Sequence, residues 1–177
     1  MKFHEALAIL ATQDKEKGIY VYTRSDLRLL FADDSKPAFD SSLKNLVSKG
    51  LLVREVTNVY TYAHAVTPKT HCRELIAQAL RPEAFNYVSM ASAMALYDND
   101  SPHITLPLEV MTTGRRGRFE TSRGPIEFTH SHRELSQLIK DTKSITGHPL
   151  RYARKAVAER DIRRAGRREL AENENIT

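Results

Sequence analysis

The strongest constraint on how this chain folds lies between residues 35 and 62. There, apolar residues at helical spacing are followed directly by two strand-like runs that a two-residue turn separates. Pro37 suits the first turn of a helix, where its missing N–H costs nothing. Apolar residues then recur at i, i+4, i+7 and i+8, on one helix face. They are Phe39, Leu43, Leu46 and Val47. Gly50 suits a left-handed C-terminal cap, and the runs LLVREV and VYTYA flank Thr57-Asn58, which predicts a β-hairpin.

Two further helices and one short strand are predicted before this segment. Residues 2–12 carry apolar side chains at helical spacing and predict a first helix. Residues 20–22 predict a short strand. A second helix through Phe31 can be capped by Thr23 or Ser25, whose hydroxyls accept from orphan N–H groups. The predicted order is therefore helix, short strand, helix, helix, hairpin.

This order is typical of a winged helix-turn-helix, here over residues 1–66. In such domains the reading helix enters the major groove of DNA. The face of helix 36–49 opposite its apolar stripe carries small, amide or basic side chains, which suit bases and phosphates. They are Ser41, Lys44, Asn45 and Ser48. Asp40, at one side, is the one unfavourable charge.

Further candidates for contacts with the DNA backbone flank the reading helix or lie on the hairpin. They are Arg24, Lys36 and Lys49, with Asn58 and Tyr60 on the hairpin. Together with the reading helix they predict an interface for double-stranded DNA. A winged helix that contacts only other proteins is the alternative.

Residues 67–177 predict a second domain, reached through a linker near residues 63–71. One helix ends at Pro82, and Ser89 caps the next. The segments ITLPLEVMTT, GRFET and PIEFTH then predict a three-stranded antiparallel sheet with glycine-containing turns. HRELSQLIKDTK predicts another helix, and a long basic helix is expected from Pro149 toward Leu170. The expected fold class is α+β, a winged helix-turn-helix followed by a small α/β domain.

Positive charge is concentrated toward the end of the chain. Residues 1–70 carry a net charge of +2, residues 71–113 carry −3, and residues 114–177 carry +6. Clustered positive charge suits a polyanion such as nucleic acid, whereas a solvated face is the alternative. The arginines singled out as candidate contacts are Arg115, Arg116, Arg118, Arg123, Arg154, Arg160 and Arg164.

Residues that carry catalytic or metal chemistry are few. The signatures of phosphate-binding loops, nucleophile elbows and zinc hydrolases are absent. The single cysteine, Cys72, excludes an intramolecular disulfide and a multi-cysteine zinc site. His130 and His132 lack a third ligand, and strand alternation predicts that Glu109 points to solvent. We therefore expect a protein that is not an enzyme, with no cofactor and no metal.

No apolar run approaches the length of a membrane helix, and the N-terminal residues do not follow the secretory pattern. We therefore expect a cytoplasmic protein that does not contact membranes.

One block of sequence resembles a known family. Tyr87-Val88-Ser89 leads into an Ala/Leu helix, and Met111-Thr112-Thr113-Gly114-Arg115 follows. Phe119 and Gly124-Pro125-Ile126-Glu127-Phe128 complete the pattern. This order resembles the second domain of AbiEi-type antitoxins and transcriptional regulators of type IV toxin–antitoxin systems. Members also carry an N-terminal winged helix, so the resemblance covers the chain to about residue 132.

The resemblance implies a sequence-specific transcriptional repressor that binds inverted repeats in its own promoter. It also implies an antitoxin that counteracts a nucleotidyltransferase-like toxin without needing a stable complex. The seven arginines singled out above remain candidates for contact with nucleic acid or with such a toxin. A stand-alone regulator of a plasmid or mobile element, with no toxin partner, is the alternative. An enzyme, such as a metal-dependent nuclease, is a third hypothesis.

Overall fold

The computed structural model describes residues 2–98 and 106–174, with side chains described as far as residue 166. The chain has mixed α and β structure and divides into two compact units, Met1–Leu80 and Arg81–Thr177. The first unit extends past residue 66, where sequence analysis places the domain boundary, because the following helix packs on its sheet.

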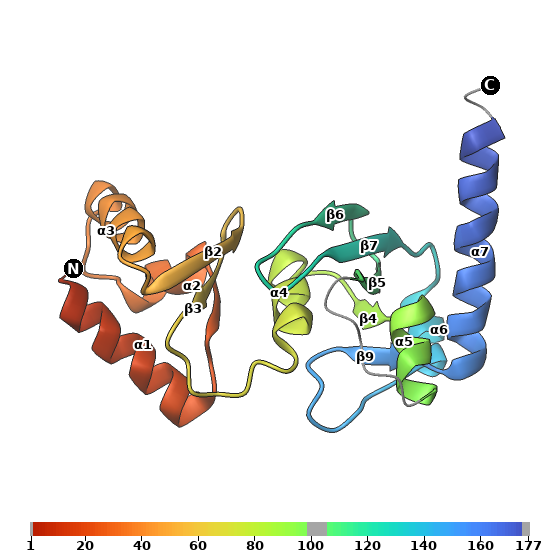
Figure 1. Cartoon of the computed structure of the whole chain (residues 1–177), viewed down its shortest axis with the longest axis horizontal. Coiled ribbons are helices and arrows are strands. Elements are labelled where there is room, and N and C mark those ends of the chain that lie inside the picture. The colour runs from red at the N-terminus through yellow and green to blue at the C-terminus, as the bar shows by residue number, and fades with distance from the viewer. Residues whose placement is uncertain (1, 99–105, 175–177) are drawn as a thin grey trace. The chain divides into compact units, whose positions relative to one another are not determined.

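The first unit contains four helices and three strands within its described residues (Figure 1). They are α1 (Phe3–Lys17), β1 (Val21–Thr23), α2 (Arg24–Leu30), α3 (Lys36–Ser48), β2 (Leu52–Val56), β3 (Val59–Tyr62) and α4 (Cys72–Leu80). The strands form an antiparallel sheet in the order β1-β3-β2. The chain therefore returns after the β2–β3 hairpin to place β3 between the other two strands.

Local signals define the starts of α2 and α3 and the end of α3 as the sequence predicts, whereas α1 continues past the predicted residue 12 to Lys17 and ends at Gly18. The Thr23 hydroxyl accepts from the N–H of Asp26 at 3.1 Å and caps α2. The Ser35 hydroxyl accepts from the third residue of α3 at 3.4 Å, and Pro37 lies in the first turn of that helix. Gly50 follows α3 with a φ of 71°, the left-handed conformation that favours glycine. The two hydroxyl caps satisfy N–H groups that a helix start leaves unpaired.

A buried carboxylate ties α1 to the segment that follows β3. Asp14 accepts hydrogen bonds from the backbone N–H groups of Val66 at 2.6 Å and Thr67 at 3.2 Å. Burial opposes ionisation of this group, but the hydrogen bonds from Thr67 and Val66 outweigh it. They lower the pKa of the Asp14 carboxyl below its usual value.

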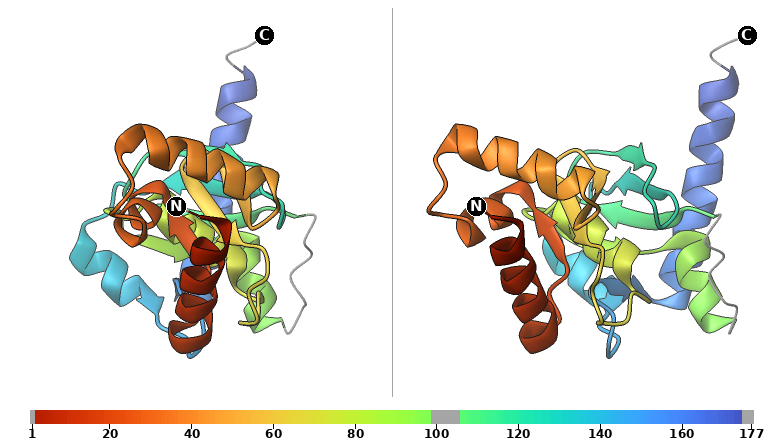
Figure 2. Two further views of the ribbon diagram at one scale, coloured as in Figure 1. Left: turned by 90° about the vertical axis from the view of Figure 1, so that its left-hand side faces the viewer. Right: turned by 60° about the vertical axis from the view of Figure 1, so that its left-hand side comes forward.

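The second unit is built around a six-stranded mixed sheet in the order β6-β7-β5-β4-β9-β8. Its elements are β4 (Asn86–Val88), α5 (Met90–Tyr97), β5 (Leu108–Thr112), β6 (Gly117–Phe119), β7 (Ile126–His130), α6 (Leu135–Asp141), β8 (Thr142–Lys143), β9 (Arg151–Ala153) and α7 (Lys155–Glu174). Helix α5 packs on β5, β9 and α7, and α6 packs on β8. Figure 1 shows α7 running beside α5, and the left view of Figure 2 shows α5 and α6 on opposite sides of this sheet.

The prediction of a three-stranded antiparallel sheet in this unit is wrong. Strands β5 and β7 are parallel neighbours, and β6 pairs antiparallel with the outer side of β7. Strand β4 lies between β5 and β9 and is parallel to β9. Three of the six strands were missed because they are two or three residues long, too short to show alternation. Residues 104–105 of the predicted strand ITLPLEVMTT lie outside the described residues.

The long basic helix begins at Lys155, later than its predicted start at Pro149, because Arg151–Ala153 form β9. Val157, Ala158 and Asp161 are buried, so the first two turns of α7 anchor it to the unit. From Ile162 to Gly166 the described side chains are exposed or half-buried. Figure 1 shows the helix continuing past α5 and α6.

Candidate nucleic-acid interface

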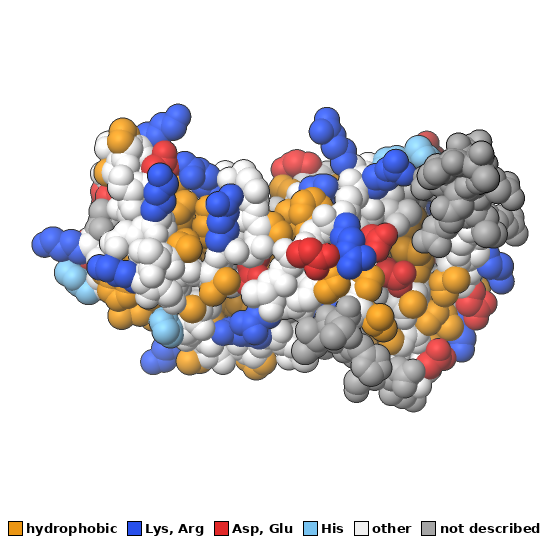
Figure 3. All heavy atoms as spheres, turned by 45° about the horizontal axis from the view of Figure 1, so that its top comes forward, with side chains coloured by type: hydrophobic (Ala, Val, Ile, Leu, Met, Phe, Trp, Pro, Cys, Tyr) orange, Lys and Arg blue, Asp and Glu red, His pale blue; other side chains and the backbone are white. Residues whose placement is uncertain are grey.

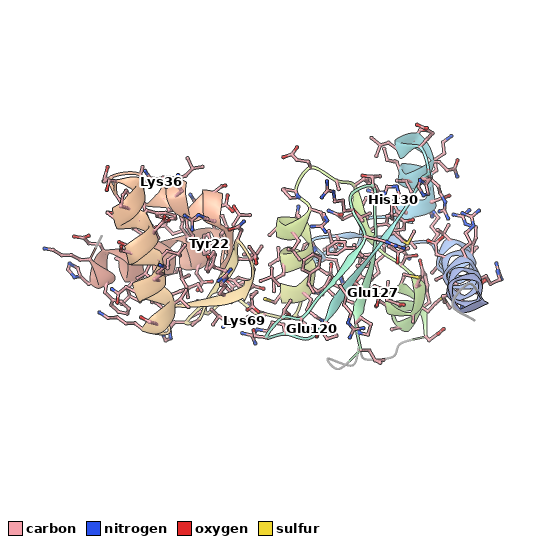
Figure 4. The ribbon with its side chains drawn as sticks, turned by 90° about the horizontal axis from the view of Figure 1, so that it is seen from above. Tyr22, Lys36, Lys69, Glu120, Glu127 and His130 are labelled. Atoms are coloured by element: carbon pink, nitrogen blue, oxygen red, sulfur yellow. The ribbon has the colours of Figure 1, made fainter. Side chains whose placement is uncertain are left out.

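Helix α3 presents the polar face that the sequence predicts. Ser41, Lys44, Asn45 and Ser48 lie on its solvent side, whereas Phe39, Leu43 and Leu46 on the opposite face are buried. The helix lies at the surface of the first unit in both views of Figure 2. The exposed lysines Lys36 and Lys49 lie at its two ends, with Lys36 in its first turn (Figure 4). A basic and hydrogen-bonding surface therefore runs the length of α3.

The acidic residue on this helix is neutralised within the unit. Asp40 forms an ion pair with Arg24, the first residue of α2. The guanidinium groups of Arg24 and Arg28 also lie 5.3 Å and 5.4 Å from the centre of the Phe39 ring. Figure 3 shows Lys and Arg side chains spread over the side of this unit that carries α3, with few acidic ones among them.

Of the two hairpin residues predicted to contact DNA, one is exposed and one is buried. Asn58 is exposed at the turn with a φ of 65°, and its carbonyl accepts from the N–H of Arg24 at 2.8 Å. Tyr60 is only 5% exposed, so its prediction as a DNA contact is wrong. The reason is its place on β3, the central strand, where all four residues are buried.

Sequence analysis missed Arg54, which is exposed on β2 directly opposite Tyr60. Its guanidinium lies 3.5 Å from the hydroxyl of Thr57 in the turn. The strand register shifts between Arg54 and Val56, and Glu55 beside it is buried against Thr61. Arg54 is the one basic residue in the sequence of this hairpin, a signal that could have identified it.

The candidate arginines of the second unit fall into distinct groups. The Nε of Arg118 lies 2.9 Å from Glu120, and its Nη1 lies 3.8 Å from Glu127. Both carboxylates lie on or next to the β6–β7 hairpin (Figure 4). Arg160 forms an ion pair with Asp141 at 2.8 Å. These two guanidinium groups are therefore already paired with carboxylates inside the unit.

The remaining candidates differ in exposure. Arg154 is exposed and donates to the carbonyl of Lys140 at 2.9 Å. Arg123 is half-buried, and its buried Nε has no hydrogen-bond partner among the residues that the structure describes. Arg115, Arg116 and Arg164 are exposed. The first two lie in the loop between β5 and β6, and Arg164 lies on α7.

A buried charge cluster anchors α7 and was not anticipated from the sequence. Asp161 has a side chain that is 1% exposed and lies 2.6 Å from the guanidinium of Arg133. It also accepts from the hydroxyl of Ser89 at 2.8 Å and lies 3.4 Å from that of Tyr87. Ser89 lies at the N-cap position of α5 as predicted, but its side chain makes no capping hydrogen bond. Ser89 and Asp161 are 72 residues apart, so no local pattern links them.

Arg133 connects this aspartate to a second one. Its other terminal nitrogen donates to Asp141 at 3.0 Å, and Asp141 also accepts from Gln137 at 2.9 Å. Burial opposes ionisation of Asp141, but Arg160, Gln137 and Arg133 outweigh it and lower the pKa of this carboxyl. The cluster therefore carries compensated charge and holds α6 and α7 together.

The expectation that Glu109 points to solvent is wrong. Its carboxylate accepts from the N–H of Ser92 in the first turn of α5 at 3.1 Å, and the Ser92 hydroxyl accepts from the N–H of Glu109 at 2.9 Å. This reciprocal pair fixes α5 on β5. Sequence alternation failed here because the solvent-facing side it assumed is covered by α5.

No protein-family model matches this chain, and neither a curated protein nor a solved structure shows significant similarity to it. The described residues contain no helix with both the length and the apolar character needed to cross a bilayer.

Proposed function

We propose that the first unit is a winged helix-turn-helix that binds double-stranded DNA, and that the protein is a transcriptional repressor. The order α1, β1, α2, α3, β2, β3 and the strand order β1-β3-β2 support this proposal. The observation that carries it is the exposed face of α3, with Lys44 and Asn45 at its centre and the carboxylate of Asp40 neutralised by Arg24. No enzymatic step is part of the proposal.

In this proposal α3 lies in the major groove. Lys44 and Asn45 contact base edges, because an amide can pair with adenine and an ammonium with guanine. Lys36 and Lys49, at the two ends of α3, contact phosphates and set the position of the helix. Arg54, on the hairpin, contacts the flanking backbone. Two copies bound to an inverted repeat would place their α3 helices about 34 Å apart, or a multiple of that distance.

A gel-shift titration with DNA selected by the full-length protein tests this proposal. The double substitution Lys44→Ala and Asn45→Ala should weaken specific binding by at least about 30-fold, since two base contacts of about 1–3 kcal/mol each contribute at least about 2 kcal/mol. The control is Lys17→Ala, which removes one exposed lysine at the far end of α1. Equal affinities for the double variant and the control would refute the assignment of α3.

We also propose that the protein is the antitoxin of a toxin–antitoxin pair. The support is the resemblance of residues 87–128 to AbiEi-type proteins. The test is growth of cells that express a nucleotidyltransferase encoded beside this protein, with and without the protein itself. Rescue of growth is expected. Failure to rescue, or a genetic neighbourhood without such a reading frame, would favour a stand-alone regulator.

A further inference from the structure

The loop between β5 and β6, residues 113–116, is held at the carbonyl groups of two adjacent residues. The Nδ1–H of His130 donates to the carbonyl of Gly114 at 2.7 Å. The Nε–H of Arg81 donates to the carbonyl of Arg115 at 3.2 Å. The loop also begins at a fixed point, because the Thr113 hydroxyl accepts from the N–H of Phe85 at 2.9 Å. Its backbone is therefore constrained from β7 and from the segment before β4.

The Arg81 side chain is itself held by contacts with two aromatic rings. Its guanidinium lies 5.2 Å from the centre of the Phe119 ring and 5.1 Å from that of Phe128. The two rings pack edge to face at 5.8 Å. A Cβ at Gly114 would lie 3.2 Å from Ala84 and 3.3 Å from the Arg81 side chain, a tight approach. The glycine thus lets the loop pack closely on this frame.

The residues that this frame presents are two adjacent arginines, Arg115 and Arg116, both exposed. A guanidinium group recognises phosphate and carboxylate oxygens equally well in geometric terms. The surroundings distinguish the two partners. Among the described residues, none of the exposed large apolar side chains lies between Leu108 and Arg133. A protein interface has an apolar centre, whereas an interface with nucleic acid is polar and positively charged.

We propose that this loop is a phosphate-binding element of the second unit, which contacts the backbone of double-stranded DNA through Arg115 and Arg116. Arg81 and His130 are positioning residues, because they hold the carbonyl groups of Arg115 and Gly114. This inference goes beyond the proposed function and does not rest on it, since it concerns a separate unit. It assigns the loop no sequence specificity, because phosphate contacts carry none directly.

The test uses full-length protein that carries Lys44→Ala and Asn45→Ala, so that the predicted base contacts of α3 are removed. Its binding to random-sequence double-stranded DNA is measured between 50 and 200 mM salt. Addition of Arg115→Ala and Arg116→Ala should make the slope of log K against log salt shallower by about 1.8, or about 0.9 for each phosphate that the protein no longer neutralises. Arg118→Ala, which removes a nearby guanidinium already paired with Glu120, is the control and should leave the slope unchanged.

The positioning residues are tested in the same assay, after circular dichroism has shown that each variant is folded. His130→Phe keeps a ring but removes the donor to Gly114, and should weaken binding. His130→Asn keeps an N–H donor and should restore most of it. A slope that is the same with and without Arg115 and Arg116 would overturn the proposal, whether or not α3 binds DNA. If α3 does not bind DNA, the loop variants should still change the slope.

Discussion

Removal of the Asp161 carboxylate should be the most damaging single substitution in the second unit. The Arg133 guanidinium is only 14% exposed. In Asp161→Ala it keeps its ion pair with Asp141 but loses the Asp161 carboxylate, which lies 2.6 Å away. The hydroxyls of Ser89 and Tyr87 are left without this acceptor as well. Removing one partner of a buried ion pair costs about 3–5 kcal/mol, and here it leaves the guanidinium groups of Arg133 and Arg160 to share the single carboxylate of Asp141. We expect a decrease of about 4 kcal/mol in the stability of this unit, a large part of a typical margin of stability.

The assay is urea unfolding followed by amide hydrogen exchange, which reports on the two units separately. For an m-value of about 2 kcal/mol per M, the midpoint for residues 81–166 should fall by about 2 M. Peptides from residues 2–80 should keep their midpoint. The control Arg133→Met with Asp161→Leu replaces both charges by apolar groups of similar size, and should recover most of the stability. A cost below about 1 kcal/mol for Asp161→Ala would refute the reasoning, since that is the range of an exposed pair.

Two further predictions concern backbone conformation and pH. Gly50→Ala should destabilise the first unit by about 1 kcal/mol, because the φ of 71° strains an L-residue even though a Cβ there meets nothing within 4 Å. Gly166→Ala should instead stabilise the exposed helix α7 by a similar amount, because alanine favours a helix interior more than glycine does. Thermal unfolding of both variants measures the signs, and equal signs would contradict this account. The lowered pKa of the Asp14 carboxyl means that its contribution is present above about pH 4 and disappears as the pH falls through the folded pKa. Asp14→Asn should therefore cost about 1.5–3 kcal/mol at pH 7 and less at pH 3, measured by urea unfolding, and a pH-independent difference would count against the hydrogen-bonded carboxylate.

The first unit could be predicted closely because its signals are local. The caps at Thr23 and Ser35 and the turn at Asn58 each depend on residues within four positions along the chain. Tyr60 could not be placed in this way. Its burial depends on which strand occupies the centre of the sheet, and the pattern of a hairpin alone does not state that order.

The second unit was harder to predict because its main contacts join distant residues. Strand β4 pairs with β9, where Tyr87 lies opposite Arg151. Nothing in the sequence around either residue indicates that they pair. The sequence likewise gives no sign that Arg133 pairs with Asp141 and Asp161. These charged side chains are largely buried, whereas charged residues are ordinarily expected at the surface. The density of positive charge predicts that Arg160 contacts nucleic acid or a toxin. In the structure Arg160 pairs with Asp141, which lies 19 positions earlier in the chain.

The position of β4 between β5 and β9 also has a consequence for synthesis on the ribosome. The first unit is complete once Leu80 has left the exit tunnel, and domains fold as units from the N-terminus. The second unit cannot complete its sheet at that stage, because an internal strand pairs with residues 151–152. A nascent chain that stops before Arg151 leaves one edge of β4 unpaired, a strand edge prone to pairing with another chain. The first unit can therefore fold well before the second, and premature termination within residues 81–150 should yield a folded first unit attached to an aggregation-prone remainder.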